Sequence, residues 1–223
     1  MSAIERLEAK ETLTEQAHRS IKRYILGGQI DFQERFTESF FADHLGISKS
    51  PVREALNSLQ NEGLLRIEPR RGIYLRRFTT KEISDLYELR EALEVFATSV
   101  VPITEKFFAA LRHSVERTES LLVQRDKAAY IEEDVDFHRL IVNTVGNEEL
   151  SRTYGNIQEK LWLCRCQTYQ LTSPDTPSAH RTIAEALGSG DRAAAEEATR
   201  RHIRFVRNAL IARADTLGKS SAA

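Results

Sequence analysis

Four residues in the second half of the chain have side chains suited to binding a transition metal: Asp134, His138, His180 and His202. Asp134 and His138 are four positions apart, so on a helix they lie on one face and can converge on one ion. One carboxylate and three imidazoles are a sufficient ligand set for a divalent transition metal. A single buried histidine is more often a hydrogen-bonded core residue than a ligand, so both interpretations stay open at this point.

The same four residues leave the metal and its coordination number undetermined. Zinc, nickel, cobalt, manganese and iron(II) all accept one carboxylate and three imidazoles. Four protein ligands would saturate a tetrahedral zinc ion, whereas a five- or six-coordinate ion would keep open positions for a small molecule. Metal-assisted hydrolysis would also need a general base, and no H-E-x-x-H or comparable motif is present. We therefore expect that the protein is not an enzyme.

A second chemical signal is a basic segment in the first half of the chain. The whole chain balances 32 Lys and Arg against 33 Asp and Glu, for a formal net charge of -1, so bulk charge indicates no function. Residues 1–78 carry 13 basic and 11 acidic side chains, and residues 79–223 carry 19 and 22. Seven basic residues face only three acidic ones between positions 49 and 77, which favours a surface that binds a polyanion.

Composition points to a mostly helical, soluble protein of one large or two modest domains. Of the 223 residues, only ten are Gly and five are Pro, which disfavours a turn-rich sandwich or barrel. A membrane span needs ~18 consecutive apolar residues, and charged residues interrupt every apolar run before that length. The N-terminus does not resemble a secretory signal. We expect a cytoplasmic protein without a membrane partner. Cys164 and Cys166 diverge on one predicted helix, so they are expected to be free thiols.

The elements that position these residues form two predicted domains. Helical periodicity over 13–26, 38–45 and 48–62, followed by strands at 64–68 and 72–76, predicts a winged helix-turn-helix in residues 1–78. Ser48 is expected to cap the third helix, and Pro51 is tolerated in its first turn.

The second domain, residues 79–217, is predicted to be an all-α antiparallel bundle of six helices. A capping box at Thr79 and Glu82 begins its first helix, which ends at Pro102. The remaining helices are expected at about 104–124, 127–145, 148–171, 179–187 and 192–214, and residues 218–223 are expected to be a flexible tail.

The first domain contains the run ESFFADHLGISKSPVREALNSLQNEGLLRIEPRRGIYL. This run resembles the DNA-binding domain of GntR-family bacterial transcription regulators. It implies that the third helix enters the major groove of double-stranded operator DNA and that the wing contacts the minor groove or its phosphates. The residues expected to contact DNA are Ser48, Lys49, Ser50, Arg53, Arg70, Arg71 and Gly72.

Physical chemistry agrees with this assignment. The N-terminus of the third helix offers unpaired N–H groups to a phosphate, with the hydroxyls of Ser48 and Ser50 beside them. Arg53 lies one turn further on, where a guanidinium can donate to O6 and N7 of a guanine. The alternative is that Arg53 forms a salt bridge within the domain. Lys49 stands where the family usually has arginine, so it keeps the charge but loses the planar fork.

The second domain contains the motifs D-V-D-F-H, G-N-E-E-L, A-H-R-T-I and R-R-H-I, in this order. With them it resembles the FCD effector domain of FadR-like GntR regulators. It implies that Asp134, His138, His180 and His202 hold a metal at the floor of a ligand cavity. It also implies that Arg90, in D-L-Y-E-L-R-E-A-L-E, grips a carboxylate with two hydrogen bonds, with Asn143 and Tyr154 as further lining residues. Alternatively, Arg90 pairs with Glu94 on its own helix.

Together these features predict a homodimeric transcriptional repressor whose operator affinity responds to a small carboxylate or sugar acid. Two-fold symmetry would match two winged domains to a pseudo-palindromic operator. The alternative is a metal sensor, in which the metal ion itself is the effector.

Overall fold

The amphipathic stretches of the sequence form helices throughout the computed structural model, which describes residues 11–27, 30–168 and 175–220. The chain divides into two compact units, Met1–Arg77 and Phe78–Ala223. Each unit has its own hydrophobic core. None of the helices in the described ranges is both long enough and apolar enough to cross a membrane.

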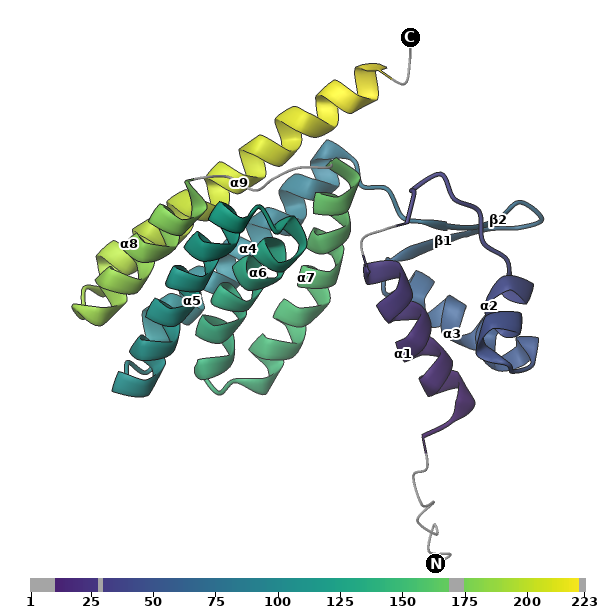
Figure 1. The fold of residues 1–223 in the computed structure, drawn as a ribbon, viewed down its shortest axis with the longest axis horizontal. Helices are drawn as coiled ribbons and strands as arrows, with labels where there is room; N and C mark the ends of the chain where they lie inside the picture. Colours follow the sequence, from purple (N-terminus) through teal and green to yellow (C-terminus); the bar gives the residue numbers. More distant parts are fainter. Residues whose placement is uncertain (1–10, 28–29, 169–174, 221–223) are drawn as a thin grey trace, which may run out of the picture. The chain divides into compact units, whose positions relative to one another are not determined.

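The first unit is the winged helix-turn-helix that the sequence predicts (Figure 1). Its two strands pair antiparallel, with Leu65 opposite Leu75, and Phe36 adds an isolated bridge to Ile73. Its elements are α1 (Leu13–Leu26), α2 (Glu38–Leu45), α3 (Lys49–Asn61), β1 (Leu65–Glu68) and β2 (Gly72–Leu75).

Packing of α1 across α3 forms the centre of this unit. Ile21 and Ile25 of α1 and Val52, Leu56 and Leu59 of α3 are almost completely buried, as their helical spacing requires. α2 ends at a glycine in the left-handed conformation, Gly46, which lets the chain turn sharply into α3. The buried α1 face and this turn leave the other side of α3 exposed.

The second unit is the predicted antiparallel bundle (Figure 1). α4 packs most extensively against α9, and α5 packs against α6 and α8. Side chains from all six helices contribute to one apolar core. The six helices are α4 (Thr80–Val100), α5 (Glu105–Gln124), α6 (Lys127–Thr144), α7 (Glu148–Thr168), α8 (Thr176–Gly188) and α9 (Arg192–Ser220).

Two predicted boundaries differ from the structure by more than one residue within the described ranges. α8 begins at Thr176 rather than at residue 179, because Pro177 fits the first helical turn, where its missing N–H has no intrahelical partner. α9 continues to Ser220, so residues 218–220 are helical rather than a flexible tail, since no proline or C-cap stops the helix after residue 214. Residues 169–171 and 221–223 lie outside the described ranges.

The start of α9 is bonded to the end of α4 through Arg192. Its guanidinium donates to the carbonyl oxygens of Thr98, at 2.9 Å, and Val101, at 2.5 Å. Carbonyls at a helix C-terminus have no intrahelical partner, and a cation there is also favoured by the helix dipole. These two bonds therefore fix the ends of the two helices that pack most extensively.

We predict that Arg192→Ala lowers the free energy of unfolding by about 2 kcal/mol, because it leaves two partly buried carbonyls without a charged donor. Urea denaturation followed by far-UV circular dichroism measures this change. Arg139→Ala is the matched control, since Arg139 makes only a surface pair with Asp136. Equal stability of the two variants would contradict the role of Arg192.

Candidate metal centre and nucleic-acid interface

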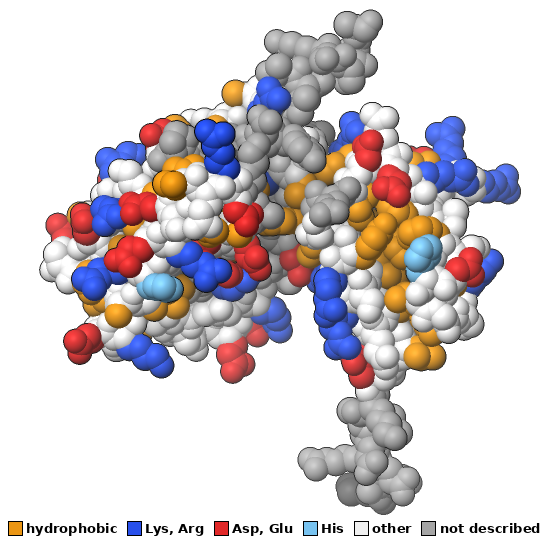
Figure 2. Space-filling model, in the orientation of Figure 1, with side chains coloured by type: hydrophobic (Ala, Val, Ile, Leu, Met, Phe, Trp, Pro, Cys, Tyr) orange, Lys and Arg blue, Asp and Glu red, His pale blue; other side chains and the backbone are white. Residues whose placement is uncertain are grey.

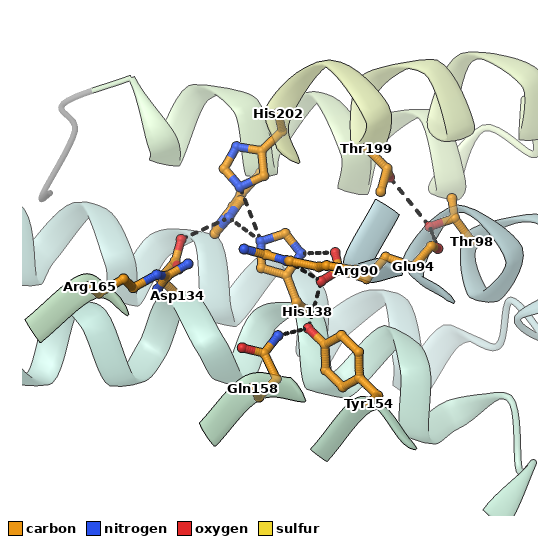
Figure 3. A network of polar contacts seen from close by, with 11 residues as sticks. Arg90, Glu94, Thr98, Asp134, His138, Tyr154, Gln158, Arg165, Thr199 and His202 are labelled. Carbon is orange, nitrogen blue, oxygen red and sulfur yellow. Dashed lines mark hydrogen bonds and ion pairs between the residues drawn. The ribbon is translucent and has the colours of Figure 1, made fainter. Parts of the chain in front are cut away.

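The four predicted metal ligands meet inside the helical unit. α6 supplies Asp134 and His138, α8 supplies His180 and α9 supplies His202, and all four are buried. Their ligand atoms all lie within 4.8 Å of one another. His138 Nε2 lies 3.1 Å from Nε2 of both His202 and His180, and His180 Nε2 lies 3.4 Å from Asp134 Oδ1 (Figure 3). Ligands bound about 2.1 Å from one ion are separated by about 3 Å, so this spacing fits a shared metal.

The protonation states of this cluster also fit a divalent cation. Burial lowers the pKa of His180 to about 4. Burial, together with the neighbouring His180, holds the pKa of His202 well below its usual value. Both imidazoles are therefore neutral at pH 7 and can offer a lone pair. Burial opposes ionisation of Asp134, but the Arg165 guanidinium, 2.6 Å from its Oδ2, holds the pKa of this carboxyl well below its usual range.

Arg90 lies beside this cluster on α4 and is completely buried. Its Nε donates to Glu94 Oε1 at 2.6 Å. The pair between Arg90 and Glu94, which was the alternative prediction from the sequence, is therefore present. This bond uses only one of its three nitrogens. Nη1 and Nη2 are both buried without a hydrogen-bond partner among the described residues. The pair with Glu94 therefore leaves the fork of Arg90 available for a carboxylate.

Glu94 connects Arg90 to the metal-ligand cluster. Its Oε1 also accepts a hydrogen bond of 2.6 Å from the Tyr154 hydroxyl, and its Oε2 lies 2.7 Å from His138 Nδ1. Burial opposes ionisation of Glu94, but the Arg90 charge holds the pKa of its carboxyl far below the usual range. The side chains form one continuous polar network in the core (Figure 3).

Asn143 does not reach this network, so its assignment to the effector site is wrong. It is exposed near the end of α6. Five positions separate it from His138, which places it about 140° around the helix from that side chain. Tyr154, by contrast, is buried and contacts Glu94.

Two functional candidates escaped the sequence analysis. Arg165 comes from α7, and nothing in its sequence neighbourhood indicates that it faces Asp134. The sequence indicated Glu94 only as a possible ion-pair partner of Arg90. Its position four residues after Arg90 also places it on the same helix face.

A surface pocket reaches the cluster from outside. It has a volume of about 270 Å³ and is lined by residues of α8 and α9, with Asp175 at its edge. His202 is part of its wall, beside Arg201 and Phe205. This pocket is a route by which an ion could approach the buried ligand atoms.

The predicted phosphate-binding residues lie together at the start of α3. Ser48 occupies the N-cap position, but its side chain makes no capping hydrogen bond, contrary to the expected cap. Ser48, Lys49 and Ser50 are all exposed. The hydroxyl groups and the first N–H groups of α3 are thus available to a phosphate.

Arg53 makes a bidentate pair with Glu38 of α2, which is the salt bridge considered from the sequence. Nε and Nη2 donate to the two carboxylate oxygens at 2.7 Å each. The Arg53 side chain is nevertheless 61% exposed. Exposed ion pairs are weak, so the guanidinium can exchange this partner for another acceptor.

The turn between β1 and β2 carries the remaining predicted contacts. Arg70, at a φ of 63°, and Arg71 are both exposed. Figure 2 shows Lys and Arg side chains gathered at this end of the hairpin. Gly72 has a φ of 134°, and a Cβ there would lie 2.8 Å from the Arg35 side chain, so this position requires glycine.

Comparison with known proteins identifies both units. Residues 13–75 match the bacterial regulatory proteins of the gntR family, and residues 85–205 match the FCD domain. The chain is 26% identical over 205 residues to a probable D-xylose utilization operon transcriptional repressor of Paenarthrobacter nicotinovorans, covering 91% of each protein. It is 34% identical over 140 residues to the Nta operon transcriptional regulator of Aminobacter aminovorans, covering 61% of this chain and 66% of that protein.

Solved structures show the same fold. A putative GntR transcriptional regulator from Rhodococcus sp. RHA1 superposes with a TM-score of 0.80 at 17% identity, covering 89% of this chain and 97% of that one. E. coli McbR/YncC gives a TM-score of 0.76 at 18% identity, covering 90% and 98%. The relatives are transcriptional regulators rather than enzymes. This chain therefore belongs to the GntR family of bacterial transcriptional regulators, with a C-terminal FCD domain.

Proposed function

We propose that the protein is a metal-containing transcriptional repressor whose affinity for operator DNA changes when a small organic acid binds the FCD domain. The convergence of Asp134 and three imidazoles in a buried site is the observation that carries this proposal. In this proposal the four side chains hold a divalent transition metal. When bound, the ion would supply a Lewis-acidic centre for an oxygen donor of the effector.

The polar atoms of Arg90 support an anionic effector. Two buried nitrogens of this guanidinium have no partner in the described part of the chain, and leaving buried donors unpaired is costly. A carboxylate offers two acceptor oxygens with the matching geometry. Relatives named for D-xylose and gluconate operons are consistent with a sugar-acid or similar effector for this chain.

A homodimer on a pseudo-palindromic operator is the proposed DNA-bound form. One winged domain covers a single half-site, so a second copy supplies the other half. α4 exposes three large apolar side chains, Leu89, Phe96 and Val100, each more than 40% accessible. Such an exposed apolar face supports association of two copies through α4.

Metal sensing is the second candidate function, and the burial of Arg90 favours it. Because Arg90 has no exposed surface, an organic acid must open the bundle to reach it, whereas an ion needs only the space between its ligands. In that case the metal itself would change the affinity for DNA.

The metal assignment predicts that the purified protein carries, or can be loaded with, one divalent transition metal per chain. Asp134→Ala and His180→Ala should each lose it, because each removes a direct ligand. Elemental analysis after dialysis measures the content, and His113→Ala, outside the cluster, is the control. Wild-type protein that neither carries nor takes up metal would refute the assignment.

The DNA assignment predicts that Arg53→Ala reduces discrimination between a selected operator and random duplex DNA by about 10- to 100-fold, through loss of a bidentate base contact. Arg70→Ala should weaken binding to both duplexes equally, since a phosphate contact carries no sequence information. Fluorescence anisotropy at fixed salt measures both affinities. Unchanged discrimination in Arg53→Ala would show that α3 does not read bases through this residue.

The two candidate functions make opposite predictions in a thermal-shift screen of small carboxylic and sugar acids against metal-loaded protein. For an effector-responsive regulator, one class of acids should stabilise the wild type, by about 2.7 kcal/mol at a hundredfold excess over Kd. Arg90→Lys should lose this shift, because lysine keeps the charge near Glu94 but lacks the fork. If no acid binds and metal alone changes operator affinity, metal sensing is the function.

A further inference from the structure

We infer that Glu94 is a positioning residue of the metal centre, which fixes the tautomer and ring orientation of His138 and holds Arg90 beside it. The inference rests on the proposed metal function and assigns a role to a residue outside the ligand set. It depends on how the two oxygens of one buried carboxylate are shared among three partners.

The first step concerns His138. Its Nδ1 forms an ion-pair contact of 2.7 Å with Glu94 Oε2, outside hydrogen-bond geometry. A carboxylate this close favours the tautomer that carries the ring proton on Nδ1. Nε2 is then left with a lone pair, and Nε2 is the atom that faces His180 and His202, 3.1 Å from each. In a metal-binding histidine, a carboxylate that contacts the ring nitrogen not bound to the metal also raises the basicity of the nitrogen that binds it.

The second step concerns the orientation of the carboxylate itself. Oε1 accepts hydrogen bonds from Arg90 Nε and the Tyr154 hydroxyl, both at 2.6 Å, which leaves Oε2 for His138. Glu94 is only 2% exposed, so water does not compete for these positions. The same carboxylate therefore orients the metal ligand on α6 and the guanidinium on α4.

The test is Glu94→Gln in the full-length protein, with Zn²⁺ affinity measured by competition with a chelator. An amide keeps the shape but loses the charge, so we expect affinity to fall by about 10- to 100-fold. Thr118→Val is the matched control: it removes a buried hydrogen bond, from the Thr118 hydroxyl to the Ser114 carbonyl oxygen, in the same bundle but outside the polar network. We expect its Zn²⁺ affinity to stay within about threefold of the wild type, because no candidate ligand or partner of a ligand is changed.

A double variant controls for misfolding. Glu94→Gln alone leaves the buried Arg90 charge without its partner, which destabilises the fold. Glu94→Gln with Arg90→Met removes both charges at similar volume and should show the same loss of Zn²⁺ affinity. ¹⁵N NMR of the metal-free protein should show the Nδ1–H tautomer of His138 in the wild type and in Thr118→Val, and a different tautomer population in Glu94→Gln.

Two results would overturn the inference. One is wild-type Zn²⁺ affinity in the double variant, and the other is an equal loss of affinity in Thr118→Val and Glu94→Gln, which would indicate a general packing defect. Wild-type protein that binds no Zn²⁺, Ni²⁺, Co²⁺, Mn²⁺ or Fe²⁺ is a distinct outcome, because it refutes the proposed metal function and this inference with it.

Discussion

The interior of the FCD domain is organised by the need to neutralise buried charges. Arg90, Glu94, Asp134 and Arg165 are each at most 9% exposed, and an isolated charge in such surroundings would be strongly destabilising. They form two pairs, Arg90 with Glu94 and Arg165 with Asp134. The two pairs flank the three imidazoles, so the requirement for charge pairing also fixes the positions of the groups that face the candidate metal site.

This constraint links the site to the fold, because the charged pairs and the imidazoles together join side chains from several helices. The Arg90–Glu94 pair lies within α4, while the Arg165–Asp134 pair joins α7 to α6. The imidazoles add α8 and α9 to the same network. A shift of one helix would break a charged contact as well as apolar packing, which makes the bundle interior sensitive to what binds there.

α4 begins close to the boundary between the two units, which falls between Arg77 and Phe78. Only four residues separate the end of β2, at Leu75, from the start of α4, at Thr80. The helix that carries Arg90 and Glu94 is thus the helix that follows the wing directly. In the proposed function, binding at the network would favour one state of the protein over another, and operator affinity would follow as the difference between those states.

Much of the fold could be predicted from the sequence, because its signals were local. Capping residues, a left-handed glycine and helical periodicity predicted every helix of the described part, and the i, i+4 spacing of Asp134 and His138 predicted one shared face. Convergence of His180 and His202 on that face depends on tertiary packing, and it was expected only through resemblance to a family. Pro177 shows the limit of local signals, since it permits a helix start as readily as it ends one.

The polar network was less predictable, because its partners come from different helices. Arg165 has no sequence signal that points to Asp134. The Asn143 prediction failed because it did not use the helical spacing: five positions from His138 place Asn143 on a different face of the helix. The pairing of Arg53 with Glu38 likewise joins two helices, and it shows how an exposed DNA-binding side chain can be satisfied in the absence of DNA.

The central claim is that four side chains of the FCD domain share one metal ion. X-ray diffraction from crystals of chelator-free protein, collected above and below the absorption edge of the metal, tests it directly. The account predicts a single anomalous peak about 2.0–2.2 Å from a carboxylate oxygen of Asp134 and from Nε2 of His138, His180 and His202. A map without such a peak, in which the imidazoles hydrogen-bond directly to one another, would contradict it.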